Sequence, residues 1–273
     1  MIGNESWNKN NENSTVEIYA QDIIDFSKAM KAVDPSILII PNGDSDEFFK
    51  TVINKAGNYI DRLCVSNYGV FDFNAGYESY RDTTRCLIWP AQTALNAMNK
   101  YATQEQLDKW KLIVAEYGTI DWAGLWHGTN DMGHAIVNFD MTGQLLLEPQ
   151  IEFSCFWNTR WLNNEEYPQT DHDAVDSNGN INPTGYSLLI WNKFMGDKMI
   201  KSESMGAIIS YASYSPHENR LFVYFINKGE REENVNLIIP NKAAAKIVQC
   251  WEYFGKDDKD VAVSYTHLTL PTT

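Results

Sequence analysis

Two glutamates stand where predicted strands end, and amide and aromatic residues surround both. Glu5 lies in Gly-Asn-Glu-Ser-Trp, directly after an apolar start that reads like the end of a buried strand. Glu116 closes the apolar run LIVAE (residues 112–116) and is followed by Tyr-Gly. In α/β barrels, functional residues gather just after the carboxyl ends of the strands. We therefore take Glu5 and Glu116 as a candidate pair of catalytic carboxylates.

Two carboxylates of this kind are the equipment for cleaving a glycosidic bond. One carboxylic acid protonates the leaving oxygen, and the other attacks the anomeric carbon or activates water. The acid has to keep its proton near neutral pH, so its surroundings must raise its pKa. The residue types and their positions thus favour glycoside hydrolysis.

Neighbouring side chains fit the same chemistry. Asn4 offers an amide to a sugar hydroxyl, and the hydroxyl of Tyr68, at the end of the run RLCVSNY, can orient an ionised carboxylate. Trp157 offers a flat aromatic face to a sugar ring. The predicted substrate-binding set is completed by Trp7, Asn67 and Tyr117. Each has a structural alternative, because strand-end glutamates, amides and aromatic rings more often belong to salt bridges and cores.

The elements that would position these residues alternate between strands and helices. Continuous apolar runs, typical of strands buried on both faces, cover residues 37–41, 62–68, 112–116 and 151–157. Helical patterns cover residues 15–33, 46–56, 91–101, 131–147 and 184–195. In the first helix Thr15 can cap the amino terminus, and one apolar stripe would contain Ile18, Ile23, Phe26, Met30 and Val33. This alternation predicts a parallel sheet with right-handed crossovers.

The pattern changes after Gly196. Short, often alternating runs at 199–204, 206–214, 220–227, 233–240 and 246–254 are typical of antiparallel strands. We predict a catalytic domain over residues 1–196 and a small β-sandwich over residues 197–263. The last ten residues, SYTHLTLPTT (264–273), resemble a translated adapter and are excluded from the predicted fold.

Four segments carry a family resemblance: GNESW, SNYG, VAEYG and FWNTRW, in that order. Together they resemble clan A of the glycoside hydrolases, and the resemblance covers about residues 1–255. It implies a TIM barrel in which Glu5 is the acid/base after strand 4 and Glu116 the nucleophile after strand 7. The segments YAQDIIDFSKAMKAVDPSI and PTGYSLLIWNKFMGDKMIKS are similar to family 51 α-L-arabinofuranosidases.

The predicted fold class is therefore α/β, the carboxyl-terminal half of a (β/α)8 barrel followed by an antiparallel β-sandwich. On this register strands 1 to 4 and their part of the cleft are missing, so we expect the chain alone to be inactive. The expected function is retaining hydrolysis of a plant or algal polysaccharide or oligosaccharide. The nucleophile segment reads AEYG where family 51 usually has Asp or Glu before Trp. Agarase-type and family 39-like enzymes, and a non-catalytic carbohydrate-binding protein, therefore stay open as alternatives.

The amino-acid composition limits the kinds of binding partner that we expect. The chain has 273 residues with 36 acidic against 22 basic side chains, a net charge of −14 that disfavours nucleic acid and anionic membranes. We expect a carbohydrate partner and no cofactor. No metal site is predicted, because His127, His134, Asp121 and Asp131 fit no ligand spacing. Cys64 and Cys155 lie in apolar runs and are expected to be buried free thiols. The sequence indicates neither localisation nor oligomeric state.

Overall fold

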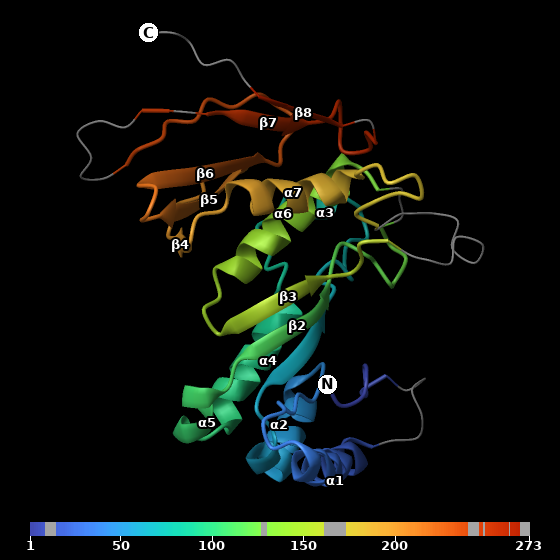
Figure 1. The fold of residues 1–273 in the computed structure, drawn as a ribbon. Coiled ribbons are helices and arrows are strands. Elements are labelled where there is room, and N and C mark those ends of the chain that lie inside the picture. Colours follow the sequence, from blue (N-terminus) through green and yellow to red (C-terminus); the bar gives the residue numbers. More distant parts are fainter. Residues whose placement is uncertain are drawn as a thin grey trace. The chain divides into compact units, whose positions relative to one another are not determined.

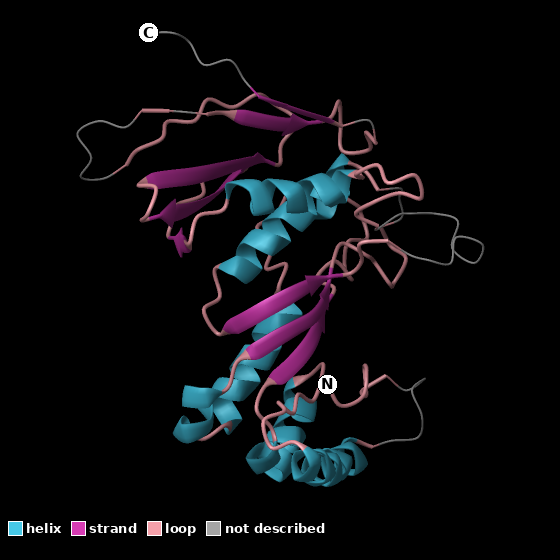
Figure 2. Cartoon of the chain, viewed as in Figure 1, coloured by secondary structure: helices cyan, strands magenta, loops and turns pink. Residues whose placement is uncertain are grey.

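The computed structural model describes residues 1–8, 15–126, 130–160, 173–239, 246–247, 249–261 and 263–267 (Figure 1). The chain forms two compact units that alternate along the sequence. The first unit contains Met1–Val70, Cys86–Gly118 and Gln144–Trp157, and the second contains Phe71–Arg85, Thr119–Gly143 and Asn158–Thr273. The fold is mixed α/β, with a parallel sheet in the first unit and antiparallel strands in the second (Figure 2).

The parallel sheet consists of β1 (Leu63–Asn67), β2 (Leu112–Tyr117) and β3 (Ile151–Phe156), in that order. Isolated parallel bridges, Asn42 to Cys64 and Ile2 to Pro41, continue the ladder beyond β1 toward the first residues. Because all these segments run in one direction, the residues that follow them share one edge of the sheet. The predicted parallel arrangement is thus confirmed.

Two of the predicted strands differ from expectation. Residues 37–41 form only the bridges at their end, and Pro41 explains part of this because it has no N–H to donate to a ladder. Strand β3 is not buried on both faces: Phe153 is half exposed and Cys155 is exposed. The prediction of a buried thiol is therefore wrong for Cys155, although Cys64 is buried and free.

Helices of the first unit pack against one another and against the sheet. They are α1 (Val16–Val33), α2 (Asp46–Ala56), the short 3-10 turn η1 (Gly57–Tyr59), α4 (Trp89–Tyr101) and α5 (Gln104–Lys109). Helix α4 packs on β1 and on α2, and α2 also packs on α1. The small side chains of Ala91, Ala94 and Ala97 are fully buried there. Pro90 lies in the first turn of α4, where its missing N–H costs no hydrogen bond.

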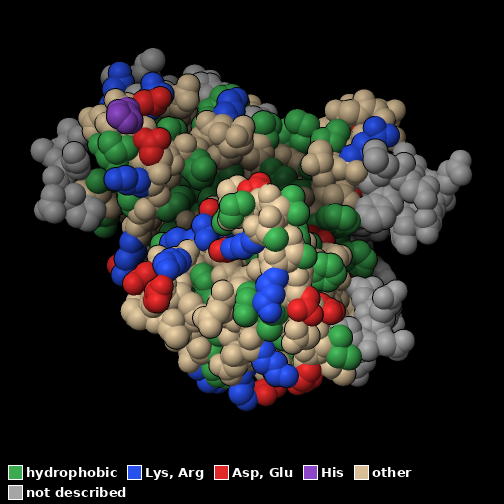
Figure 3. All heavy atoms as spheres, turned by 60° about the horizontal axis from the view of Figure 1, so that its bottom comes forward, with side chains coloured by type: hydrophobic (Ala, Val, Ile, Leu, Met, Phe, Trp, Pro, Cys, Tyr) green, Lys and Arg blue, Asp and Glu red, His purple; other side chains and the backbone are tan. Residues whose placement is uncertain are grey.

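Thr15 caps α1 as predicted, since its hydroxyl accepts from the Ile18 N–H at 3.3 Å. The predicted apolar stripe does not coincide with the buried face of this helix. Ile23 is fully buried, whereas Ile18, Phe26, Met30 and Val33 are exposed. The helix packs instead with the neighbouring face that carries Tyr19, Ala20, Ile23 and Ser27. Figure 3 shows hydrophobic side chains at the surface among the charged ones.

The second unit combines short helices with antiparallel strands. Its helices are α3 (Glu78–Arg81), most of α6 (Met132–Leu146) and α7 (Pro183–Phe194). One sheet has the order β4 (Lys198–Ile200), β5 (Ile208–Ser215), β6 (Arg220–Asn227), and β7 (Trp251–Phe254) pairs with β8 (Ser264–His267). Residues 233–239 form no strand, contrary to prediction. Strand β8 lies within residues 264–273, a segment that the predicted fold does not include.

A buried carboxylate organises the second unit. Asp140 on α6 is 1% exposed and accepts hydrogen bonds from the hydroxyls of Tyr80, at 2.8 Å, and Tyr211. Trp191 of α7 stacks on Phe139 with the ring centroids 4.6 Å apart, and its indole N–H donates to the Phe139 carbonyl. These contacts join α6 to α3, α7 and β5, and they give the buried carboxyl group of Asp140 hydrogen-bond partners.

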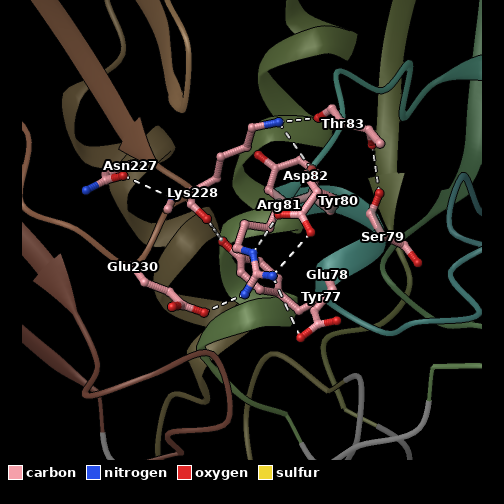
Figure 4. Close-up of polar contacts among 11 residues, drawn as sticks. Tyr77, Glu78, Ser79, Tyr80, Arg81, Asp82, Thr83, Asn227, Lys228 and Glu230 are labelled. Atoms are coloured by element: carbon pink, nitrogen blue, oxygen red, sulfur yellow. Dashed lines mark hydrogen bonds and ion pairs between the residues drawn. The ribbon is translucent and has the colours of Figure 1, made fainter.

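Lys228, just after β6, adds a second connection to α3 (Figure 4). Its ammonium group is buried and donates to the carbonyls of Tyr80, at 3.2 Å, and Thr83. Tyr77 in turn donates to the Lys228 carbonyl at 3.0 Å. Burial lowers the pKa of Lys228, because desolvation disfavours the charged form.

Candidate functional site

Glu116 is the penultimate residue of β2 and is partly buried. It lies opposite Ser66 of β1, after an irregularity in the register between Val65 and Ser66 that shifts the pairing by one residue. Irregularities of this kind re-aim side chains near the end of a strand. The continuous apolar run before Glu116 therefore anchors a carboxylate at the carboxyl edge of the parallel sheet.

Tyr68, the residue after β1, reaches this carboxylate. Its hydroxyl donates to Oε2 of Glu116 at 2.7 Å, and its side chain is only 4% exposed. The chain turns closely behind Tyr68: a Cβ at Gly69 would lie 1.9 Å from the carbonyl oxygen of Leu87. Glycine at position 69 thus permits the close backbone approach that follows Tyr68.

The electrostatic surroundings of Glu116 raise the pKa of its carboxyl group. Burial is the largest cause, and the negative charge of Glu5 acts in the same direction. The hydrogen bond from Tyr68 acts in the opposite direction, because it stabilises the charged form. Glu5 and Glu116 are thus electrostatically coupled although 110 residues separate them in the sequence.

Glu5 occupies a tight turn at the amino terminus. Its φ is +44°, an uncommon backbone conformation for a residue with a side chain, and its carbonyl accepts from the Asn8 N–H at 2.8 Å. The Glu5 side chain is partly buried, as is that of Trp7, and Asn4 is exposed. The turn therefore carries three of the residues that the sequence predicts for the site.

Asn67 and Tyr117 belong to the interior of the first unit. Asn67 is fully buried; its amide N–H donates to the Leu87 carbonyl at 3.1 Å, and its amide oxygen accepts from the Ala91 N–H at 3.3 Å. Tyr117 is 5% exposed and contacts Phe156 edge-on. The geometry favours structural roles for both over the predicted contacts with substrate.

Trp157 follows β3 at the same edge of the sheet. Its backbone N–H donates to the Tyr117 carbonyl at 2.8 Å, and its side chain is partly exposed. Gly118 is closely approached by this segment, since a Cβ there would lie 2.8 Å from the Trp157 carbonyl oxygen. Trp157 therefore lies at the carboxyl edge of the sheet, where the sequence predicts a platform for a sugar ring.

Asn42 was not among the predicted site residues, yet its amide contacts the turn around Glu5. Its Oδ1 accepts from the Ser6 N–H at 2.8 Å, and its Nδ2 donates to the Ile2 carbonyl at 3.0 Å. The sequence does contain a signal for Asn42, because it directly follows the apolar run at 37–41. Glu5 and Glu116 likewise stand at the ends of their predicted strands.

The loop after β2 and the first turn of α6 contain the residues considered for metal binding. The buried ring of His134 bonds through Nδ1 to Asp131 at 2.7 Å and stacks on Trp126 at 3.8 Å. Asp121 accepts from the backbone N–H groups of Ala123, Leu125 and Trp126. These contacts are structural; His127 lies outside the described residues. Among the residues that the structure describes, no cluster of three or more His, Cys, Asp or Glu could hold a metal ion.

Comparison with solved structures identifies the class of fold. The GH51 α-L-arabinofuranosidase from Thermotoga petrophila RKU-1 matches with a TM-score of 0.74 and 18% identity, over 99% of this chain and 62% of that chain. The arabinose complex of the Thermotoga maritima α-L-arabinofuranosidase matches with a TM-score of 0.72 and 16% identity, over 98% and 61%. A GH86 protein in complex with neoagarooctaose matches with 0.64 and 12%, over 93% and 43%.

The fold is therefore similar to that of the family 51 arabinofuranosidases, as the sequence motifs predicted. The chain spans about three fifths of the length of these enzymes. No protein-family model and no curated protein matches the sequence. No helix among the described residues is long and apolar enough to cross a membrane.

Proposed function

We propose that the protein is a retaining glycoside hydrolase in which Glu116 is the nucleophile and Glu5 the acid/base. The observation that carries this proposal is the hydrogen bond from Tyr68 to Glu116 at the carboxyl edge of the sheet, with the charge of Glu5 acting on the same carboxylate. A buried, oriented carboxylate coupled to a second one is the arrangement that glycosidic cleavage requires.

Tyr68 supports the division of roles. A hydroxyl that donates to a carboxylate stabilises its ionised form and fixes one oxygen, which leaves the other oxygen for attack on the anomeric carbon. Glu5 would then protonate the leaving oxygen and, in the second half of the reaction, deprotonate the incoming water.

The proposed substrate contacts come from the partly or fully exposed members of the predicted set. Asn4 would bind a sugar hydroxyl, Trp157 would stack on a ring, and Trp7 would form a wall of the cleft. The parallel sheet would be part of a (β/α)8 barrel, and the strands after residue 196 would form a β-sandwich. The domain boundaries at residues 196 and 263 remain predictions.

The proposed substrate is an O-glycoside of a plant or algal polysaccharide or oligosaccharide, with arabinofuranosides first because the family 51 enzymes have the higher TM-scores. The similarity to a GH86 protein crystallised with neoagarooctaose supports an agarase-type galactan hydrolase as the second candidate. The presence of both carboxylates supports an enzyme over a non-catalytic sugar-binding protein.

The stereochemical course tests the reaction class. Proton NMR of the first product of an aryl glycoside should show the anomeric configuration of the substrate, which is the outcome of a double displacement. In a crystal structure the carboxyl carbons of Glu5 and Glu116 should lie about 5 to 5.5 Å apart. Inversion, or a separation beyond about 10 Å, would exclude the assigned roles.

A further inference from the structure

The turn that holds Glu5 is strained. Both Gly3, at φ +68°, and Glu5, at φ +44°, have left-handed backbone conformations. For a residue with a Cβ this conformation costs on the order of 1 kcal/mol, and it persists only where surrounding contacts fix it. The contacts that fix Glu5 therefore decide where its carboxylate points.

Asn42 and Tyr19 supply several of these contacts. Asn42 accepts from the Ser6 N–H on one side of Glu5 and donates to the Ile2 carbonyl on the other, at 2.8 and 3.0 Å. The Tyr19 hydroxyl donates to the same Ile2 carbonyl at 2.7 Å, and it accepts from the backbone N–H of Asn42 at 3.0 Å. Asn42 Nδ2 also lies 3.1 Å from this hydroxyl. The two side chains thus bond to both sides of the Glu5 turn.

The clasp, by which we mean Asn42 and Tyr19, is buried and uncharged. Asn42 is 2% exposed and Tyr19 is 4% exposed. Burial raises the pKa of Tyr19 to about 12, so its hydroxyl keeps its proton across the range in which carboxylates titrate. Hydrogen bonds of buried neutral groups are protected from competition with water. The clasp therefore keeps the same bonds while Glu5 gains and loses its proton.

We propose that Asn42, supported by Tyr19, is the positioning residue of the acid/base Glu5. By bonding on both sides of the turn, the clasp holds the backbone of Glu5 in its left-handed conformation and directs the carboxylate toward Glu116. This inference rests on the proposed function. Asn42 acts through Glu5 and is not itself a catalytic residue.

Substitution separates positioning from simple support of the fold. In the full-length protein, Asn42→Ala should reduce kcat/KM, which reports the first step, by roughly 10–100-fold on glycosides with poor leaving groups and far less on glycosides with activated leaving groups. Poor leaving groups need protonation by a well-placed acid, whereas activated ones do not. Tyr19→Phe, which keeps the buried ring, should show the same selectivity in weaker form.

Ser27→Ala is the matched control. Ser27 lies on the same helix as Tyr19, is 2% exposed, and donates to the Tyr59 carbonyl at 2.9 Å, away from the Glu5 turn. Loss of the Ser27 hydroxyl should lower the melting temperature, and any change in kcat/KM should be the same for all leaving groups. If Asn42→Ala does not fold, Tyr19→Phe alone carries the comparison. Equal losses on both substrate types would overturn the proposal.

A titration decides the inference without turnover. In protein labelled with 13C-glutamate, the Glu116 carboxyl signal is assigned by its disappearance in Glu116→Gln. Because the charge of Glu5 raises the pKa of Glu116, Glu5→Gln should lower that pKa, and Asn42→Ala should lower it in part by moving Glu5 away. Ser27→Ala should leave it unchanged. An unaltered pKa in Asn42→Ala would refute positioning, whereas the absence of any glycosidase activity would refute only the proposed function.

Discussion

The Tyr68 hydroxyl donates a 2.7 Å hydrogen bond to Oε2 of Glu116, which joins the residue after β1 to the end of β2. Parallel strands make this contact possible, because their carboxyl ends lie at the same edge of the sheet. Through this bond β1 directly influences the pKa of Glu116.

Removal of this hydroxyl should shift the pH dependence of activity. The hydrogen bond lowers the pKa of Glu116, so Tyr68→Phe should raise that pKa and move the acidic limb of kcat/KM to higher pH. A hydrogen bond to a charged group contributes about 1.5–3 kcal/mol, so we expect a loss of roughly 10–100-fold in kcat/KM near neutral pH.

Tyr101→Phe is the control for this prediction. Tyr101 donates to Asp46 at the same distance of 2.7 Å, on the helices of the first unit, and that bond lowers the pKa of Asp46. Its removal should leave the pH profile of activity unchanged. Identical profiles for Tyr68→Phe and the unmodified protein would argue against Glu116 as the ionised nucleophile.

Stability should also respond to Glu116. Because its pKa is raised in the folded state, the folded protein binds more protons than the unfolded chain between the two pKa values. Its contribution to stability is therefore most favourable below the unfolded pKa and is lost as the pH rises through the folded pKa. Glu116→Gln, which keeps the shape and cannot ionise, should melt at a higher temperature than the unmodified protein at neutral pH.

Thermal melts from about pH 4 to about pH 8 check this sign. The melting temperatures of the unmodified protein and of Glu116→Gln should be similar at the acidic end, where residue 116 is neutral in both. They should diverge as the pH rises. A variant that is less stable than the unmodified protein at neutral pH would show that the Glu116 charge stabilises the fold.

The acid/base role of Glu5 predicts a dependence on the leaving group. Glu5→Ala should retain the first step on dinitrophenyl glycosides, the release of dinitrophenol, and lose roughly 100-fold or more in kcat/KM on unactivated glycosides, the usual range for general acid catalysis. Glu17→Ala, an exposed glutamate in the first turn of α1, should leave both substrates unaffected. Kinetics on a series of aryl glycosides measures how log kcat/KM depends on the pKa of the leaving group. Equal losses throughout the series would contradict the role of Glu5.

The second unit offers a prediction about stability alone. Lys228→Ala leaves the Tyr80 and Thr83 carbonyls without their buried donor, and we expect a loss of about 1–3 kcal/mol in the free energy of unfolding. Lys228→Met keeps the packing of the stem and should cost less. Lys201→Ala, at an exposed position, should change stability by less than about 0.5 kcal/mol. Denaturant titration compares the three, and an unchanged midpoint for Lys228→Ala would contradict this account.

Much of the first unit could be predicted from the sequence because its strands are short continuous apolar runs. The run at 112–116 predicted β2, which extends one residue further, and in the second unit residues 131–147 predicted α6 to within one residue at each end. The positions of Glu116 and Tyr68 at the carboxyl ends of neighbouring strands then followed from the parallel topology. Their mutual distance did not, because side-chain direction depends on the register irregularity at Val65.

Other features could not be predicted because they depend on tertiary contacts. The buried face of α1 is set by its packing against α2, and the apolar residues Phe26 and Val33 are exposed although their spacing fits a buried stripe. The clasp joins Tyr19, Asn42 and the Glu5 turn across 17 to 40 residues of sequence, for which no local pattern exists. The left-handed backbone of Glu5 is equally invisible in a residue type that seldom adopts it.

The covalent glycosyl-enzyme tests the central claim most directly. In Glu5→Ala of the full-length protein, a dinitrophenyl glycoside should react once and then stall, because no base activates water for the second step. Mass spectrometry should find the mass of one glycosyl residue added to the protein, and peptide mapping should place it on Glu116. A sugar bonded to any residue other than Glu116 would contradict the account. So would a second pair of results together: Glu5→Ala turns over the activated substrate without accumulating an adduct, and the unmodified protein inverts the anomeric configuration.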